Sequence, residues 1–352
     1  MIDSQETKHK KSIYDLSAFE IFLKESEYRD RDIQRLRRKV YKDFVFNPSK
    51  DLVEIGDVYK SNFIDTFLAL SKRVDSKIDG ASKLLLTTAD GYKIETVILR
   101  IKSGRVTLCV SSQVGCTEKC EFCATAQLGF LRNLTTDEIL DQVRIAGTIL
   151  AEEGLKIRNI VFMGMGEPLR NYKVLKESLI KLTMGKMFAF ALKNITVSTS
   201  GIAPGMTKLS KDFPDLCIAL SLNASCDEQR SKIMPINNKY PIMSLREALE
   251  EMSRAHSGMC LIEYILFEGF NDTEDDVYRL ASLLKGLSVH INLISYNSSS
   301  LASFNLRGSS ENQILKFQKS LQSFGFIVTR RYSLGQDIFA ACGQLANKAL
   351  KT

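Results

Sequence analysis

The chain has 352 residues, of which 44% are hydrophobic, enough to bury the core of one large domain with an appendage or of two domains. Its 48 basic and 41 acidic residues give a net charge of +7, which favours a polyanionic partner without requiring one. The start is polar and charged, and we see no run of about 18 apolar residues that could span a bilayer. We therefore expect a cytoplasmic protein without membrane contact, which excludes membrane transport and a secreted disulfide scaffold.

Residues 14 to about 75 are predicted to form short helices, with breaks at Asn47-Pro48 and at Gly56. From Tyr28 to Phe44, apolar residues recur at helical spacing, and basic residues lie largely off that stripe. The basic residues can form a solvated helix face or a surface that contacts RNA phosphates, and the pattern does not choose between the two. The apolar stripe comprises Ile33, Leu36, Val40 and Phe44, and the basic residues are Arg31, Arg35, Arg38, Lys39 and Lys42.

The stretch from Lys83 to Val114 alternates in polarity and is rich in β-branched residues. Turn signals at Asp90-Gly91 and Ser103-Gly104 divide it, so we predict strands joined as hairpins. The last of these strands leads directly into a loop that contains three cysteines.

That loop reads Cys-Thr-Glu-Lys-Cys-Glu-Phe-Cys and offers Cys116, Cys120 and Cys123 to one metal centre. A [4Fe–4S] cluster normally takes four cysteines, so three close cysteines leave one iron open. An open iron can bind S-adenosylmethionine (SAM) and cleave it reductively, and the triplet therefore predicts radical chemistry. A structural zinc site needs four ligands in two pairs, and none of the three histidines lies next to a cysteine pair.

From the cysteine loop to about residue 300, strands and helices alternate, which predicts an α/β fold with parallel strands. The first helix is expected from Thr135 to Glu153, where Thr135 and Glu138 have the spacing of a capping box. A buried strand from Asn159 to Met163 follows it. Further strands are predicted at 194–198, 216–221, 260–266 and 290–294, and further helices at 174–182, 245–254 and 275–284.

Polar residues follow several of these strands, at the end where parallel α/β enzymes place their active sites. Gly164-Met165-Gly166-Glu167-Pro168 comes after a buried strand; its glycines allow a close backbone approach, and Glu167 can accept hydrogen bonds from an amine or a ribose. In isolation such a segment is more often only a tight turn. Because it follows a cysteine triplet, we expect it to bind the amino group of SAM. Small polar groups at later strand ends can bind SAM or cap helices; they are Ser198-Thr199-Ser200-Gly201, Ser221-Leu222-Asn223 and Tyr296-Asn297.

The segment beyond Ser309 is predicted to hold one helix, at 311–324, and one strand, at 326–332. The chain then runs through Ala-Ala-Cys-Gly, where small residues leave the thiol of Cys342 approachable. Other cysteines outside the loop are expected to be buried structural residues; they are Cys217, Cys226 and Cys260.

Taken together, these motifs resemble the RlmN family, the radical-SAM adenine-C2 methyltransferases of RNA. The triplet alone indicates only a radical-SAM enzyme, whereas AACGQL near the end of the chain is typical of the methyl synthases that use two further cysteines. The resemblance spans roughly residues 85 to 350, and the helices before residue 75 resemble that family's accessory RNA-binding domain more loosely. The matching stretches are LCVSSQVGCTEKCEFCATAQLGFLRNLT, VFMGMGEPL, ITVSTSG, IMPINNKYPI, INLISYN and DIFAACGQL.

The resemblance implies a partial (β/α)6 radical-SAM barrel with a small helical accessory domain before it and an extension after it. The expected parts are an RNA-binding accessory domain at 1–78, a β-hairpin linker at 79–105, the radical-SAM core at 106–300 and an extension with the methyl-carrying cysteine at 301–352.

The resemblance also implies roles for five cysteines. Cys116, Cys120 and Cys123 would ligate the cluster, and a first SAM would methylate Cys342 by nucleophilic displacement. A second SAM would be reduced to a 5′-deoxyadenosyl radical that takes hydrogen from the new S-methyl group, and the methylene radical would add to C2 of an adenine. Cys109 would then resolve the adduct and leave a Cys109–Cys342 disulfide, which must be reduced before the next turnover.

Glu95 matches the residue that accepts a proton in the family. The chain departs from the family at two places. Asn223 stands where the family usually has the histidine of Ser-Leu-His, and Ser298-Ser299-Ser300 stands where a proline-bearing loop is common. Because asparagine still donates and accepts hydrogen bonds, we expect altered contacts to SAM and not lost binding. Implied partners are 23S rRNA and tRNA, with a flavodoxin or ferredoxin as electron donor, and the protein is expected to be a monomer. The positions that match the family's SAM contacts are Gly166, Glu167, Ser198, Ser221, Leu222, Asn223 and Asn297.

Several alternatives stay open. The Cfr group methylates C8 of the same adenine, although Cys-Ala-Thr-Ala-Gln-Leu-Gly-Phe and Gly-Met-Gly-Glu-Pro resemble the C2 enzymes more. A divergent paralog could act on another RNA, and a radical-SAM enzyme could act on a small molecule or a protein, which the basic N-terminal helices disfavour. An RNA-binding protein that uses a cluster as a structural staple is the alternative without catalysis.

Overall fold

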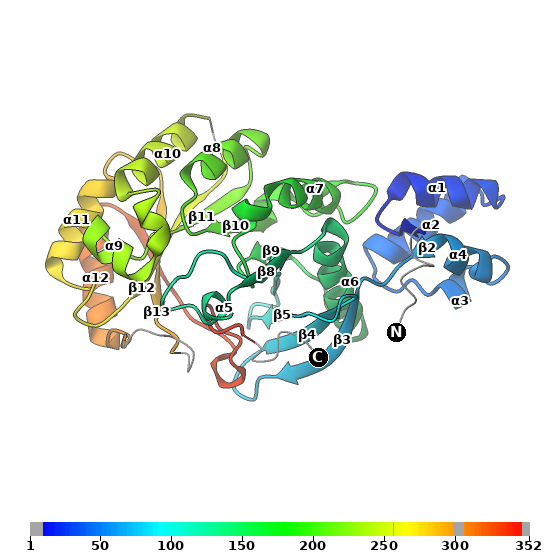
Figure 1. The fold of residues 1–352 in the computed structure, drawn as a ribbon, viewed down its shortest axis with the longest axis horizontal. Helices are drawn as coiled ribbons and strands as arrows, with labels where there is room; N and C mark the ends of the chain where they lie inside the picture. The colour runs from blue at the N-terminus through cyan, green and yellow to red at the C-terminus, as the bar shows by residue number, and fades with distance from the viewer. Residues whose placement is uncertain (1–9, 256, 299–305, 347–352) are drawn as a thin grey trace.

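The computed structural model describes residues 10–255, 257–298 and 306–346. Within these residues, a small lobe of short helices lies at one end of the molecule, and a larger lobe is built on one ten-stranded sheet (Figure 1). The strand order is β14-β13-β12-β11-β10-β9-β6-β5-β4-β3. Neighbours from β3 to β6 pair antiparallel, and neighbours from β6 to β14 pair parallel.

The helical lobe closes on itself through two short strands that pair in parallel. Three residues of the predicted apolar stripe, Ile33, Leu36 and Val40, are buried on the second helix of the lobe, which confirms this part of the prediction. Phe44 lies beyond the end of that helix and is half-buried, so the helix ends before the stripe does. The elements of the lobe are β1 (Lys11–Ser12), α1 (Leu16–Glu25), α2 (Asp30–Tyr41), α3 (Pro48–Asp51), α4 (Gly56–Asn62) and β2 (Phe63–Ile64).

The prediction of helices up to about residue 75 is wrong over its last part, because Leu68–Asp75 form strand β3. This strand lies at the edge of the large sheet, where it pairs with β4 (Ala81–Thr88). Leu68 is buried, but most of the following side chains are exposed, so the strand lacks the alternation that marks a half-buried strand. The helices therefore end before the predicted boundary at residue 78.

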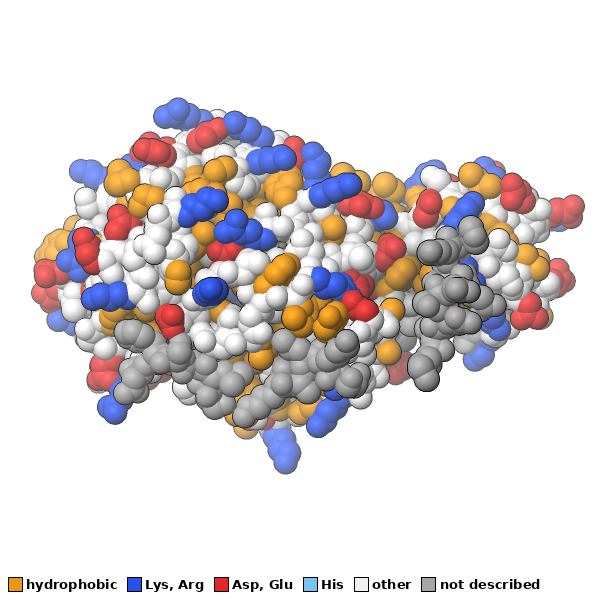
Figure 2. Space-filling view, viewed as in Figure 1, with side chains coloured by type: hydrophobic (Ala, Val, Ile, Leu, Met, Phe, Trp, Pro, Cys, Tyr) orange, Lys and Arg blue, Asp and Glu red, His pale blue; other side chains and the backbone are white. Residues whose placement is uncertain are grey.

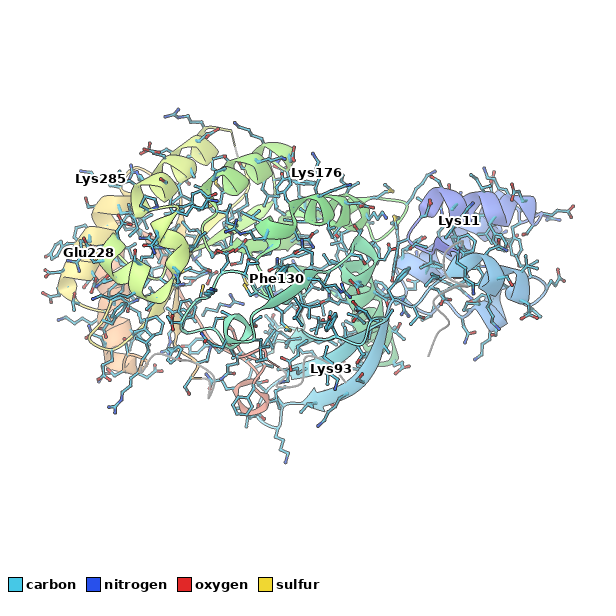
Figure 3. The ribbon with its side chains drawn as sticks, in the orientation of Figure 1. Lys11, Lys93, Phe130, Lys176, Glu228 and Lys285 are labelled. Atoms are coloured by element: carbon cyan, nitrogen blue, oxygen red, sulfur yellow. The ribbon has the colours of Figure 1, made fainter. Side chains whose placement is uncertain are left out.

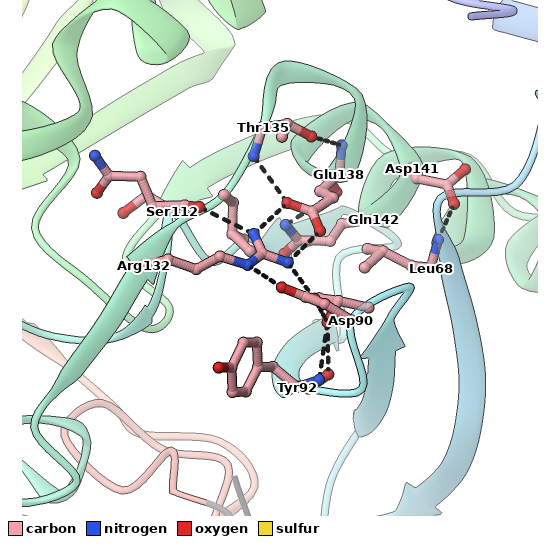
Figure 4. Close-up of polar contacts among 12 residues, drawn as sticks. Leu68, Asp90, Tyr92, Ser112, Arg132, Thr135, Glu138, Asp141 and Gln142 are labelled. Carbon is pink, nitrogen blue, oxygen red and sulfur yellow. Dashed lines mark hydrogen bonds and ion pairs between the residues drawn. The ribbon is translucent and has the colours of Figure 1, made fainter. Parts of the chain in front are cut away.

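The predicted hairpins are confirmed by β4, β5 (Lys93–Arg100) and β6 (Val106–Cys109). Arg132 fixes the first turn to the cysteine loop, because its guanidinium donates twice to Asp90 (both 2.7 Å) and twice to Glu138 (2.7 and 2.8 Å; Figure 4). The hydrogen bonds from Arg132 to Asp90 are the first cause that lowers the pKa of Asp90, to about 2. Paired donors that meet paired acceptors are geometrically specific, so the hairpin, the cysteine loop and the start of α6 keep one arrangement.

The cysteine loop and the β/α units follow in the predicted order. The predicted capping box is present at the start of α6, with Thr135 and Glu138 satisfying each other's backbone N–H groups. The sequence patterns did not reveal α8 and α9. The elements are β7 (Gln113–Gly115), α5 (Ala124–Gln127), β8 (Phe130–Asn133), α6 (Thr136–Glu152), β9 (Asn159–Phe162), α7 (Tyr172–Thr183), β10 (Ile195–Thr199), α8 (Ala203–Asp212), β11 (Cys217–Ser221), α9 (Asp227–Ile233), α10 (Ile242–Ala255), β12 (Cys260–Leu266), α11 (Glu274–Leu284), β13 (His290–Ser295), α12 (Glu311–Ser323) and β14 (Ile327–Arg331).

The parallel strands from β6 to β13 form the expected partial barrel, and β14 from the C-terminal extension continues the sheet. The helices that connect these strands lie along the outside of the sheet (Figure 1). The carboxyl ends of the strands share one rim, so the residues that follow them meet there.

After β14 the C-terminal loop (residues 332–346) crosses to the β3–β4 end of the sheet. Asp337 accepts hydrogen bonds from the hydroxyl of Ser76 (2.8 Å) and the amide of Lys77 (2.9 Å), and Asp79 accepts one from the amide of Gly335 (2.7 Å). The predicted core boundary at residues 300 and 301, and Ser299-Ser300, lie outside the described residues. Every helix of the described ranges is too short or too polar to cross a membrane.

Candidate active site

The three loop cysteines line one cavity at the carboxyl ends of the parallel strands. The loop closes tightly, because a Cβ on Gly115 would lie 1.9 Å from the carbonyl oxygen of Gly129. Glycine also permits the positive φ of +79° at that position. The amide of Cys116 donates to the same carbonyl (2.9 Å), and the amide of Cys123 donates to the carbonyl of Cys120 (3.1 Å). The backbone therefore presents all three thiols to the same space.

The donor set at this loop suits an iron–sulfur cluster. Burial is the first cause that raises the pKa of all three thiols, and the charge of Cys123 raises it further for Cys116 and Cys120. A metal that replaces the protons removes this cost, and thiolates prefer soft metals. Among residues 10–255, 257–298 and 306–346, no three ligand side chains converge as the ligands of a single metal ion would. In a cluster each thiolate binds its own iron, so wider spacing fits.

Glu167 follows β9 in the wall of the same cavity and is buried. Its carboxylate accepts hydrogen bonds from the amide and hydroxyl of Ser200 (2.7 and 2.8 Å) and from the amide of Leu169 (3.0 Å). Burial raises its pKa, and these three contacts oppose that shift. Gly166 has φ +101°, and a Cβ there would lie 2.6 Å from Cβ of Gln113. The turn thus brings a carboxylate against the cysteine loop, where it can receive an ammonium group.

The next strand ends bring Ser198, Ser221 and Asn223 to this cavity, whereas Leu222 is buried in the core. The two serine hydroxyls are 3.5 Å apart. Asn223 has φ +57°, which asparagine tolerates better than most residues. Its amide oxygen accepts a hydrogen bond from the amide of Ile265 (2.9 Å), so part of its hydrogen-bonding capacity holds the strand ends together.

Arg230 of α9 lies fully buried behind these strand ends. Its guanidinium donates to the backbone carbonyls of Ser200, Ser221 (3.3 Å) and Leu222 (3.0 Å). Burial lowers its pKa to about 10, and the charge of Cys120 opposes this shift. The contacts fix two neighbouring strand ends, and the positive charge favours an anionic group at the cysteines.

Asn297 follows β13 but faces the C-terminal loop. Its side-chain nitrogen donates to the hydroxyl of Ser333 (2.9 Å) and to the carbonyl of Cys342 (3.3 Å). Its oxygen accepts a hydrogen bond from Gln336 (2.8 Å). In this arrangement Asn297 positions the loop that carries Cys342, and its predicted contact with SAM stays a prediction.

Cys342 lines the cavity of the three loop cysteines and also a second, adjoining cavity, which Cys109 lines at the end of β6. Burial raises the pKa of Cys109 to about 12, and the charge of Cys342 contributes to that shift. Both thiols are free, so the predicted disulfide stays a prediction. Arg331 of β14 lines both cavities, and the charge of Cys342 is the first cause that raises its pKa. The charge of Arg331 opposes part of the rise in the pKa of Cys109.

Glu95 lies on β5, outside the set of residues that line the two cavities, and is 3% exposed. Lys83 of β4 lies 3.2 Å from its Oε1, and Oε2 has no hydrogen-bond partner among the described residues. Burial raises the pKa of Glu95, while Lys83 and the backbone of Ala346 oppose the shift. The structure therefore places Glu95 under the C-terminal loop that carries Cys342.

Sequence reasoning missed four charged residues around this site: Lys83, Arg230, Glu263 and Arg331. Glu263 carried a usable signal, because a carboxylate interrupts the apolar strand Cys260–Leu266. It is buried, lines both cavities and lies 3.7 Å from Arg331. Arg230 carried no such signal, because its short helix contains mostly polar residues and reads as a surface segment.

The sequence and the structure of this chain are similar to those of known proteins. The family model described as the radical SAM superfamily matches residues 110–281. A probable dual-specificity RNA methyltransferase RlmN of Thermotoga neapolitana is 38% identical over 96% of this chain and 98% of its own length. The ribosomal RNA large subunit methyltransferase Cfr of Bacillus velezensis is 35% identical over 92% of this chain and 94% of its own.

A solved structure has the same fold over nearly the whole chain. The crystal structure of a radical SAM methyltransferase from Sphaerobacter thermophilus has a TM-score of 0.88 and 34% sequence identity, and the match covers 95% of this chain and 98% of that one.

Proposed function

Because the chain belongs to the radical SAM RNA methyltransferases of the RlmN/Cfr type, we propose that it methylates C2 of an adenosine in 23S rRNA through a methyl group carried on Cys342. Enzymes of this type use a [4Fe–4S] cluster and SAM and act on RNA. One observation carries the proposal: Cys342 lines the same cavity as the three loop cysteines and the Glu167 turn. A thiol in that position can receive a methyl group from SAM.

In this proposal Cys116, Cys120 and Cys123 hold the cluster, which supplies the electron for reductive cleavage of SAM. Glu167 binds the amine of SAM, supported by its burial and its three hydrogen bonds from neighbouring N–H and O–H groups. Ser198, Ser221 and Asn223 line the remaining wall, where small polar groups can contact the ribose and adenine. Gly166 keeps the wall close to the cysteine loop, and Leu222 packs behind it.

Cys342 acts as the nucleophile that accepts the methyl group, and Arg331 lines the same two cavities. Glu95 accepts the proton released from C2 of the adenine, supported by its unpartnered Oε2 and its raised pKa. Cys109 then attacks the sulfur of Cys342 and forms a disulfide with it. The bond from that sulfur to the CH2 group breaks, and the carbon keeps the bonding pair and takes up a proton, which frees the methylated RNA. The second cavity, which both cysteines line, supports this pairing.

We assign delivery of the electron that the cluster needs to a flavodoxin or ferredoxin, and the resulting disulfide must be reduced before the next turnover. The name of the Thermotoga relative includes dual specificity, so we propose tRNA as a second substrate. The helical lobe is proposed to bind RNA through the basic face of α2. We further propose that the enzyme works as a monomer in the cytoplasm.

Methylation at C8 is the second candidate, and the similarity to Cfr supports it. The two products have the same mass but differ in chromatographic retention and fragmentation. We expect 2-methyladenosine in nuclease-digested 23S rRNA after expression of this chain in a bacterial host that lacks its own C2 and C8 enzymes. Appearance of 8-methyladenosine in its place would reject the C2 assignment.

Cys342→Ala tests the methyl carrier directly. The reconstituted variant is expected to bind SAM as the wild type does but to form no methylated RNA and no S-methylcysteine, because no other side chain can carry the methyl group. Cys226→Ala is the matched control, since Cys226 is half-buried like Cys342 but lies at the start of α9. An RNA-binding protein with a structural cluster would bind RNA equally well with either substitution and would methylate with neither. Methylation by Cys342→Ala at the wild-type rate would contradict the proposed route.

A further inference from the structure

Lys83 is a cation enclosed between strand β4 and the C-terminal loop. Its side chain is 15% exposed. Its ammonium group lies 3.2 Å from Oε1 of Glu95 and donates to the carbonyl of Phe339 (3.1 Å). Burying an ammonium group is costly unless it is paired, so a surface role does not account for this position.

The two partners of Lys83 belong to the two functional parts of the proposed site, the proton acceptor and the loop with the methyl-carrying cysteine. In the β4–β5 register, Lys83 pairs with Val97 and Leu85 pairs with Glu95, so Lys83 and Glu95 are diagonal neighbours on one face of rigid strands. Phe339 precedes Cys342 by three residues in the C-terminal loop. Lys83 is therefore in contact with both the proposed proton acceptor and the loop that carries the proposed methyl carrier.

The two oxygens of Glu95 have different surroundings. Oε1 faces Lys83, and a backbone hydrogen bond from Ala346 also acts on the carboxylate, whereas Oε2 is buried and makes no hydrogen bond of ordinary geometry with the described residues. A buried carboxylate oxygen without a partner is rare and needs an explanation. An incoming C–H group that gives up its proton to Oε2 supplies one.

We propose that Lys83 is a positioning residue for the proton transfer of RNA methylation. It holds Glu95 through Oε1, leaves Oε2 to accept the proton from C2 of the adenine, and ties this base to the loop that carries Cys342. In the step itself the C2–H bond of the radical adduct breaks, the proton goes to Oε2, and the bonding pair stays in the purine ring. The one surplus electron would return to the oxidised cluster that Cys116, Cys120 and Cys123 would hold. The inference rests on the proposed function.

The charges around Glu95 predict how the rate of RNA methylation depends on pH. A base must be ionised to act, so methylation rises with pH through the raised pKa of Glu95. Lys83 from β4 and the backbone of Ala346 from the C-terminal loop both oppose that rise. Removing the lysine charge raises the pKa further, so the acidic limb of the pH profile moves to higher pH.

The test compares Lys83→Met, Lys83→Gln and Lys83→Arg with the wild type. Lys72→Met is the matched control, because Lys72 is an exposed lysine on neighbouring strand β3. Each reconstituted enzyme is given SAM and a 23S rRNA fragment, and three products are measured: S-methylcysteine at position 342, 5′-deoxyadenosine, and methylated RNA. We expect Lys83→Met and Lys83→Gln to form the first two as the wild type does, with RNA methylation near neutral pH about 100-fold slower.

The loss should shrink as pH rises, and Lys83→Arg should restore most of the activity near neutral pH. Equal RNA methylation and an unchanged acidic limb in Lys83→Met would overturn the proposal. If Lys83→Met fails to fold, Lys83→Gln decides, because it keeps a hydrogen-bond donor of similar length without the charge. If the Lys83 variants lose S-methylcysteine as well as RNA methylation, Lys83 acts only by holding the C-terminal loop. That result would also overturn its role in positioning Glu95. Failure of the wild type to make S-methylcysteine would instead reject the proposed function.

Discussion

Glu167 and Glu95 are both buried carboxylates, but the structure satisfies them by different means. Glu167 receives two amide N–H groups and one hydroxyl, whereas the Oε1 of Glu95 faces the ammonium group of Lys83. Dipoles stabilise a carboxylate without neutralising it, so Glu167 keeps a net charge that can bind a cation. Glu95 already has a cation beside it, and its open oxygen is suited to take a proton.

Glu167→Gln should therefore weaken SAM binding more than it changes the fold. The amide has the same shape, but it loses the charge and turns a donor toward the donors of Ser200. We expect the Kd for SAM to rise by about 10- to 100-fold, which corresponds to the loss of one charge-assisted hydrogen bond. Anaerobic titration calorimetry with the reconstituted protein measures this change. Ser200→Ala, which removes one donor and keeps the carboxylate, should have a smaller effect; an unchanged Kd in Glu167→Gln would remove the amine contact from the proposal.

At the residue scale, the sequence could predict what depends on local spacing. The cysteine triplet and the glycines before Glu167 are set within a few residues, and the structure places them around one cavity. Arg230 and Lys83 could not be found in this way, because each becomes significant only through partners that are distant in the chain. Lys83 contacts Phe339, which lies 256 residues away.

At the element scale, α6 is the junction between the helical lobe and the sheet. Asp141 on this helix is fully buried and accepts hydrogen bonds from the hydroxyl of Tyr14 (2.8 Å) and from the amides of Phe67 and Leu68 (2.9 and 2.8 Å). Arg144 also donates to it (2.6 Å). One carboxylate thus joins the helical lobe, the start of β3 and α6, and Figure 4 shows its contact with Leu68.

Asp141→Asn should destabilise the protein by about 3–5 kcal/mol, because it removes the charge opposite a largely buried arginine and one acceptor of a buried network. Urea denaturation followed by circular dichroism measures the free energy of unfolding. Asp57→Asn is the control, since the Asp57 side chain is fully exposed in α4. Equal stability of the two variants would show that the lobe is held by its apolar contacts without this carboxylate.

Helices and strands were predicted correctly where the periodic pattern of apolar residues in the sequence is strong. α6 and β12 combine a clear pattern with burial, and their bounds agree with the prediction to within a residue. β3 failed because an edge strand with exposed side chains carries no burial pattern; its backbone pairing with β4 makes it a strand. The part of the C-terminal loop that follows β14 was also beyond prediction, because contacts with residues 76–79 fix its course.

Across the whole molecule, basic side chains are spread over several surfaces. Figure 2 shows them over α7, α8 and α10 as well as on the helical lobe, where acidic side chains are interspersed. On α2 itself, Arg35 pairs with Asp32 (3.4 Å) and Arg38 pairs with Asp43 (2.8 Å). These exposed pairs are weak, so the arginines can exchange a carboxylate for a phosphate at little cost.

The exposed basic residues of α2 and its C-terminal end are the place where we expect RNA to bind. Replacement of exposed Arg31, Arg35 and Lys42 by glutamine should weaken binding of a 23S rRNA fragment and reduce the steepness of its salt dependence. Each lost phosphate contact lowers the slope of log affinity against log salt by roughly 0.7–0.9. Fluorescence anisotropy between about 50 and 200 mM salt measures both quantities.

A control triple tests whether the effect is specific to the helical lobe. Lys285, Lys316 and Lys319 are exposed at the α11–α12 end, and Figure 3 labels Lys285 there and Lys11 at the opposite end. Their replacement by glutamine changes the net charge equally, so a general electrostatic attraction would weaken equally in both triples. If only the α2 triple lowers the slope, the helical lobe is the surface that holds RNA phosphates. If neither does, RNA phosphates are held by other residues, and the α2 face is a solvated helix surface.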